Sequence, residues 1–144
     1  MSLDFLTVSI IVVFVSLFLE FFHVKFLKMC HGIDLLFFAP WLVAIKFGFS
    51  NAMALGFIVM SIHVIFNLHM ARFVLLALPA LLIAIILGTT LGIAGFYTTL
   101  MSYMIVSSVT TTAFGGLGGR FILFLMVGSV FNVGLFSLSQ GLVL

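Results

Sequence analysis

Residues 73–114 form a stretch of about 42 residues without a single Asp, Glu, Lys or Arg. That is twice the roughly 20 apolar residues that an α-helix needs to cross a bilayer. We therefore expect the stretch to fold back on itself as two helices. A cluster of Gly and Thr between residues 88 and 95 provides typical turn residues. The sequence thus predicts a helical hairpin embedded in lipid.

The composition of the whole chain supports the same class of protein. Of 144 residues, 65% are hydrophobic and only 6% are charged, whereas soluble domains carry about 25% charged residues. This excludes a soluble globular protein and a disordered chain. The formal net charge of +2 is too small to favour nucleic acid as a partner. We expect an integral membrane protein with the lipid bilayer as its main surroundings.

The apolar runs divide residues 1–144 into about six predicted spans that form a single all-α transmembrane helical bundle. The spans cover about residues 4–22, 33–47, 51–68, 73–90, 94–113 and 121–140. The links that carry most Lys and Arg fall on one side, and this side is expected to face the cytoplasm. Lys46 is the exception, because it falls in a link on the opposite side. The distribution predicts a multi-pass protein, in a plasma membrane, with both termini outside the cytoplasm.

Several polar side chains lie inside or beside the apolar runs. His63 and Asn67 are one helical turn apart, so they share a face of the third span. Polar groups within the membrane are costly and usually face the bundle interior. We expect ligand contacts from Glu20, His31, Asp34, His63, Asn67 and Asn132. The alternative is that such residues only form hydrogen bonds between helices.

The link after the first span is the most polar part of the chain. His23, Cys30, His31 and Asp34 are of residue types that bind zinc, nickel or cobalt, although the adjacent Cys30 and His31 do not have a usual zinc spacing. These residues are candidates for a mouth that takes a polar ligand or a metal ion. The alternative is an interfacial anchor with a salt bridge. In either case we expect the link to fold against the bundle.

The sequence contains no recognisable catalytic motif. The glycine-rich link at residues 115–119 lacks the Lys and Ser/Thr that complete a phosphate-binding loop. No serine-hydrolase or zinc-protease motif is present, and no paired carboxylates suggest acid–base chemistry. We therefore expect a protein that is not an enzyme and has no cofactor.

The layout of residues 34–67 provides a family resemblance. A glycine follows the second span in Lys-Phe-Gly-Phe-Ser-Asn, and another glycine occurs early in the third span. Together with Phe-Asn-Val-Gly-Leu-Phe at residues 131–136, this resembles the substrate-binding S components of energy-coupling-factor importers. It also resembles the cell-shape protein family MreD. Both resemblances imply a small six-helix bundle that works with partner subunits in the membrane.

Two functions remain open from these observations. One is a small integral membrane component that binds or transports a small solute, as an S-component-like importer subunit. The alternative is a structural or assembly subunit of a membrane complex, an MreD-like scaffold without a ligand. A scaffold should have rows of polar side chains along its helices, here called polar stripes, that hydrogen-bond to one another between helices and leave no cavity. A solute-binding subunit should instead enclose a polar cavity.

Overall fold

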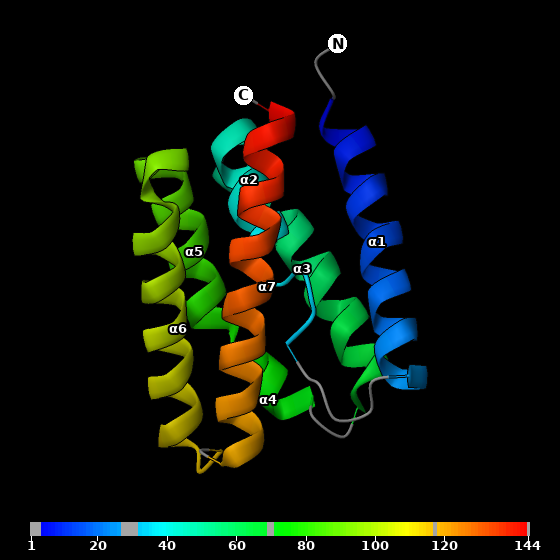
Figure 1. Ribbon diagram of the computed structural model, residues 1–144, viewed down its shortest axis with the longest axis vertical. Coiled ribbons are helices and arrows are strands. Elements are labelled where there is room, and N and C mark those ends of the chain that lie inside the picture. Colours follow the sequence, from blue (N-terminus) through cyan, green and yellow to red (C-terminus); the bar gives the residue numbers. More distant parts are fainter. Residues whose placement is uncertain (1–3, 27–31, 69–70, 117, 144) are drawn as a thin grey trace.

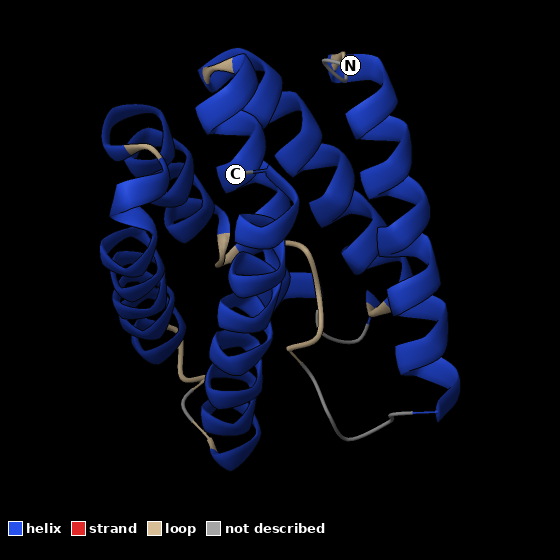
Figure 2. Ribbon diagram, turned by 45° about the horizontal axis from the view of Figure 1, so that its top comes forward, coloured by secondary structure: helices blue, strands red, loops and turns tan. Residues whose placement is uncertain are grey.

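The computed structural model describes residues 4–26, 32–68, 71–116 and 118–143, and their regular structure is entirely helical (Figures 1 and 2). The helices pack as a bundle, which confirms the predicted all-α fold. In chain order they are α1 Phe5–Phe26, α2 Phe38–Phe47, α3 Phe49–Phe66, α4 Ala71–Leu75, α5 Leu78–Leu91, α6 Phe96–Ala113 and α7 Gly119–Val143. A short 3₁₀ turn, Ile93–Gly95, precedes α6.

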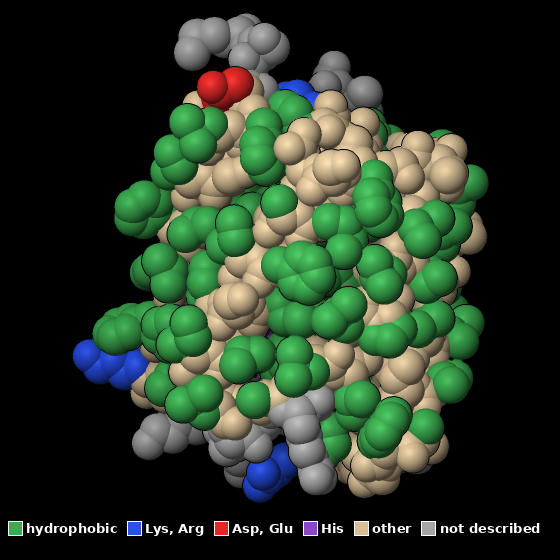
Figure 3. All heavy atoms as spheres, turned by 180° about the vertical axis from the view of Figure 1, so that it is seen from behind, with side chains coloured by type: hydrophobic (Ala, Val, Ile, Leu, Met, Phe, Trp, Pro, Cys, Tyr) green, Lys and Arg blue, Asp and Glu red, His purple; other side chains and the backbone are tan. Residues whose placement is uncertain are grey.

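Five stretches within the described residues are long and apolar enough to cross a membrane. They are Phe5–Phe26, Phe49–Phe66, Phe73–Leu91, Ile93–Ala113 and Gly119–Gln140. Large hydrophobic side chains are exposed along these helices. In Figure 3 such side chains cover the middle of the face that is shown. The acidic and basic side chains visible on this face lie toward its two ends. This surface is that of an integral membrane protein.

The second predicted span differs from the structure. Its helix, α2, begins at Phe38, so residues 33–37 are not helical as the prediction over 33–47 required. A helix of ten residues is about 15 Å long, which is half of the roughly 30 Å hydrocarbon core. Residues 32–37, ahead of α2, form an irregular segment that runs between the helices (Figures 1 and 2).

The irregular segment is among the most deeply buried parts of the molecule. Leu36 and Phe37 are 4% and 1% exposed. The carboxylate of Asp34 accepts a hydrogen bond from the backbone N–H of Leu36 at 3.0 Å, which stabilises the turn ahead of α2. Irregular backbone is tolerated at membrane depth only where protein or a water-filled cavity surrounds it. The bundle therefore provides the cover that lipid could not give.

Gly32 places this segment directly against α7. Its φ is +114°, and a Cβ added there would lie 2.6 Å from the carbonyl oxygen of Phe124 and 3.0 Å from the backbone nitrogen of Gly128. A side chain at position 32 would thus collide with the helix backbone. The close approach of loop and helix depends on glycine at this position.

The reversal expected within residues 73–114 is present between α5 and α6. Gly92 has a φ of +61° and ends α5, and the two helices then pack side by side (Figure 1). An aromatic cluster from α2, α6 and α7 fills part of the core. Phe96 and Phe136 stack with ring centroids 3.9 Å apart, and Trp41 packs edge-on against both. This cluster joins α2 to α6 and α7.

The first helix starts with a side-chain cap. An oxygen of the Asp4 carboxylate accepts a hydrogen bond from the backbone N–H of Thr7 at 3.0 Å. That is the usual way to satisfy a free N–H at a helix start. Hydrogen bonding to Thr7 also lowers the pKa of the Asp4 carboxyl, which is fully exposed. Asp4 thus stabilises the start of α1.

Candidate functional site

A buried polar triad joins α1 to the end of α3. Glu20 from α1 pairs through one carboxylate oxygen with Nδ1 of His63. Its other oxygen accepts a hydrogen bond from the side-chain amide of Asn67 at 2.9 Å. Glu20 and Asn67 are 4% and 3% exposed. Three of the residues predicted as ligand contacts therefore lie together, and they satisfy one another.

The position of Asn67 follows from how α3 ends. The helix stops at Phe66, and the backbone N–H of Asn67 still bonds the carbonyl of His63 at 3.0 Å. The side-chain amide of Asn67 reaches the same carbonyl at 3.1 Å as well as Glu20. Asn67 thus closes the helix and fixes the Glu20 carboxylate. The triad is a rigid link between two helices.

A cavity of about 290 Å³ lies next to His63. Its walls come from α4, α6, the start of α7 and the irregular segment before α2. The residues that line it include Leu36, His63, Phe73, Val74, Ala77, Ser107, Thr111, Gly116, Gly118, Arg120, Phe121 and Phe124. Most of these are apolar, and a few polar groups converge among them. That is the usual make-up of a small-molecule pocket.

Two hydroxyl groups face this cavity without a protein partner. Ser107 and Thr111 on α6 are 3% and 4% exposed. In the described part of the chain neither hydroxyl makes a hydrogen bond. Their neighbour Ser108 differs, since its hydroxyl donates to the carbonyl of Met104 at 2.7 Å. The cavity therefore holds hydrogen-bonding capacity that the described fold does not use.

Most other hydroxyls in the bundle bond their own helix rather than a neighbouring one. Each donates to a carbonyl one turn back, as shown by Ser61, Thr90, Thr99, Ser108, Ser129 and Ser137. Bonds of this kind satisfy the hydroxyl locally. Hydrogen bonds between helices were the alternative role expected for the polar stripes. These hydroxyls contribute little to such bonds, because they bond their own helix. Among the described residues, Ser9 and Ser16 on α1 also have buried hydroxyls without a partner, whereas Ser107 and Thr111 are the pair that lines the cavity.

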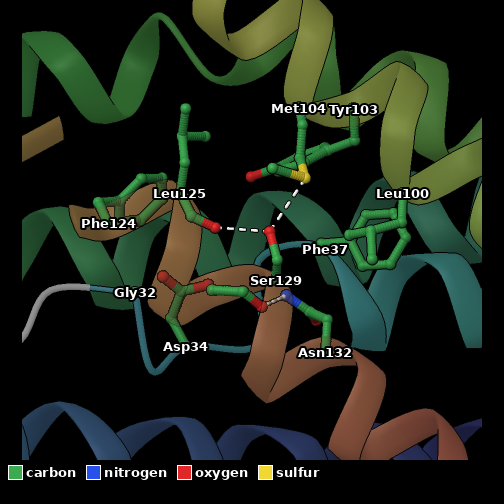
Figure 4. Close-up of a pocket in the computed structure, with 11 residues that line it drawn as sticks. Gly32, Asp34, Phe37, Leu100, Tyr103, Met104, Phe124, Leu125, Ser129 and Asn132 are labelled. Carbon is green, nitrogen blue, oxygen red and sulfur yellow. Dashed lines mark hydrogen bonds between the residues drawn. The ribbon is translucent and has the colours of Figure 1, made fainter. Parts of the chain in front are cut away.

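A second, much smaller pocket of about 20 Å³ lies between the irregular segment, α6 and α7 (Figure 4). Asp34 and Asn132 both line it, and they are 8% and 5% exposed. One carboxylate oxygen of Asp34 and the amide oxygen of Asn132 are buried without a hydrogen-bond partner. Two further predicted site residues thus meet here, apart from the Glu20 triad. Phe124 lines this pocket and also the large cavity.

The remaining predicted residues do not form a metal site in the described structure. Cys30 and His31 lie outside the described residues. His23 is on α1, one turn after Glu20, and is 5% exposed. No group of three His, Cys, Asp or Glu is arranged to hold a metal ion within residues 4–26, 32–68, 71–116 and 118–143.

Three polar residues of the cavity, Ser107, Thr111 and Arg120, were not among the site residues predicted from the sequence. The signal for Thr111 was present, because Thr99, Tyr103, Ser107 and Thr111 recur every four residues and all four are buried. Arg120 was used only as a marker of orientation. Its place at the cavity depends on how the link after α6 folds back, which spacing along the chain does not reveal.

No protein-family model, no curated protein and no solved structure matches this chain. The geometry of the two pockets is therefore the basis for a functional proposal.

Proposed function

We propose that this chain is a small multi-pass component of a cell membrane that binds a small polar solute for transport. An S-component-like importer subunit, working with partner subunits, is the concrete form of the proposal. The observation that carries it is the cavity of about 290 Å³ with the free hydroxyls of Ser107 and Thr111 in its wall. Small-molecule pockets typically begin at about 300 Å³. A compact solute of metabolite size fits this volume.

The lining favours a solute that accepts hydrogen bonds. The Ser107 and Thr111 hydroxyls can donate, and Arg120, an exposed residue, is also among the residues that line the cavity. A guanidinium offers five donors and pairs well with carboxylate or phosphate groups. No Asp or Glu is among the lining residues. We therefore propose a solute with an apolar body and an anionic group.

The alternative, a scaffold without a ligand, has different expectations. Its polar stripes should satisfy one another between helices and leave no cavity. The Glu20 triad fits that expectation, since its members are mutually bonded. The hydroxyls of Ser107 and Thr111 do not fit it. This difference favours solute binding, and the proposal includes no catalytic role because the cavity lacks a nucleophile paired with a base.

Ligand-induced thermal shift of the purified protein tests this proposal. The probes are nicotinate, biotin and pantothenate, which are compact and carry a carboxylate. We expect at least one of them to raise the unfolding midpoint. The paired change Ser107→Ala and Thr111→Val should weaken that binding roughly tenfold or more, since each lost hydrogen bond costs about 1 kcal/mol. Mass spectrometry of small molecules that copurify with the protein can detect bound solutes other than these three probes.

The matched control is Ser108→Ala with Thr112→Val, at the next position along the same helix. Ser108 bonds its own helix and Thr112 is exposed, and neither lines the cavity. This variant should bind as the unchanged protein does. If no probe shifts the midpoint and no small molecule copurifies, the scaffold alternative replaces the proposal. Equal losses in both paired variants would place the solute elsewhere.

A further inference from the structure

The small pocket between the irregular segment and α7 contains acceptor atoms in excess of donors. One Asp34 oxygen is bonded to the Leu36 N–H, and the other has no partner. The amide nitrogen of Asn132 donates to the carbonyl of Gly128 at 2.7 Å, which directs its unpartnered oxygen away from that bond. Leaving a buried polar atom without a partner costs about 1–3 kcal/mol. The two residues that carry these atoms line one pocket.

A third oxygen in this pocket also has lone pairs to offer. The Ser129 hydroxyl donates its hydrogen toward the carbonyl of Leu125 at 2.6 Å and the sulfur of Met104 at 3.0 Å (Figure 4). Its lone pairs remain. A group that binds among these three oxygens must supply positive charge or donors and need no acceptor.

We propose that this pocket binds one small monovalent cation, with sodium as the ion that fits best. Oxygen ligands from carboxylate, amide and hydroxyl groups suit hard cations. Asp34 is the single carboxylate among the residues that line the pocket, so one positive charge neutralises it. A volume of about 20 Å³ accommodates one water-sized particle. This size favours sodium over the larger potassium ion.

The pocket lies against irregular backbone within the helical bundle. Asp34 belongs to irregular backbone at the depth of the bundle, and α2 begins only four residues later. In membrane transporters, interrupted helices place polar backbone and side chains at such depths, where they hold ions. Phe124 lines both this pocket and the large cavity, so the two pockets share one side chain of α7.

The cation site goes beyond the proposed solute function and does not depend on it. The test is the unfolding midpoint of the purified full chain in NaCl, KCl or choline chloride at equal ionic strength. We expect NaCl to raise the midpoint by at least about 3 °C relative to choline chloride, with saturation, and KCl to raise it less. Asp34→Asn and Asn132→Leu should each weaken the sodium response at least tenfold.

The matched control is Asp4→Asn, which removes an exposed carboxylate far from the pocket in sequence and should leave the sodium response intact. Broadening of the ²³Na resonance by the protein provides a second readout that needs no unfolding. It should disappear in Asn132→Leu even if Asp34→Asn folds poorly. The Ser107→Ala and Thr111→Val pair should keep its sodium response, which separates this site from the solute cavity.

Three outcomes would overturn the cation site. Equal midpoints in all three salts, without ²³Na broadening, would mean that the pocket holds water or that Asp34 is protonated. A response that follows ionic strength alone would indicate screening at the surface. A full sodium response in both Asp34→Asn and Asn132→Leu would place the ion elsewhere.

Discussion

Glu20→Ala is expected to lower the free energy of unfolding by about 3–5 kcal/mol. The change removes the partner of both His63 and Asn67 and leaves their polar groups without a carboxylate inside the bundle. Breaking a buried charge pair by deleting one member has this cost because the other member stays buried. Unfolding in graded denaturing detergent, followed by circular dichroism of the helices, measures the loss.

Asp4→Ala is the control for this change. Asp4 is exposed and caps the start of α1 through its hydrogen bonding to Thr7, so its loss should cost about 1 kcal/mol. The combined change Glu20→Leu with His63→Leu should recover part of the stability, since well-packed apolar residues often replace a buried pair without loss. A Glu20→Ala protein no less stable than Asp4→Ala would show that the triad contributes little to holding α1 on α3.

Gly32→Ala is expected to destabilise the protein by about 3 kcal/mol or more. The added methyl group would meet the backbone oxygen of Phe124 at 2.6 Å, and backbone atoms of a helix cannot move aside cheaply. The left-handed φ at Gly32 adds about 1–2 kcal/mol of strain for any other residue. Overpacking of this kind costs about 1–3 kcal/mol by itself. The same detergent titration measures the effect.

Gly128→Ala is the matched control, because Gly128 lies on the α7 side of the same contact. A Cβ there would be 3.4 Å from its nearest neighbour, the Gly32 carbonyl oxygen, which is an ordinary contact distance. Alanine also favours a helix over glycine by up to about 1 kcal/mol. Gly128→Ala should thus be neutral or slightly stabilising. If the two changes altered the free energy of unfolding to a similar extent, this would contradict the close contact of the irregular segment with α7.

Hydropathy and turn residues were enough to predict the helical hairpin around Gly92. They were not enough for residues 33–37, because Leu35, Leu36 and Phe37 are as apolar as any helix in this chain. Hydropathy reports that a segment avoids water, and it does not distinguish a helix from irregular chain that other helices cover. The information that decides between them is the contact of Gly32 with α7, which is far away in sequence.

The candidate sites show the same limit. Spacing predicted that His63 and Asn67 share a face, and burial cost predicted that both point inward, but their common partner Glu20 is on another helix. The pocket at Asp34 and Asn132 needs the irregular segment and α7 in register. Arg120 was read from the sequence as an orientation marker, and only the fold of the link after α6 brings it to the cavity. Each of these depends on packing between helices.

The irregular segment also has a consequence for the order of assembly in the membrane. Backbone groups outside a helix cannot enter lipid on their own, since each unsatisfied group costs several kcal/mol there. Residues 32–37 are covered in part by α7, and the aromatic cluster anchors α2 on α6 and α7. Both helices are synthesised long after residue 47. The segment of residues 32–47 therefore reaches its final place only after α6 and α7 have been synthesised.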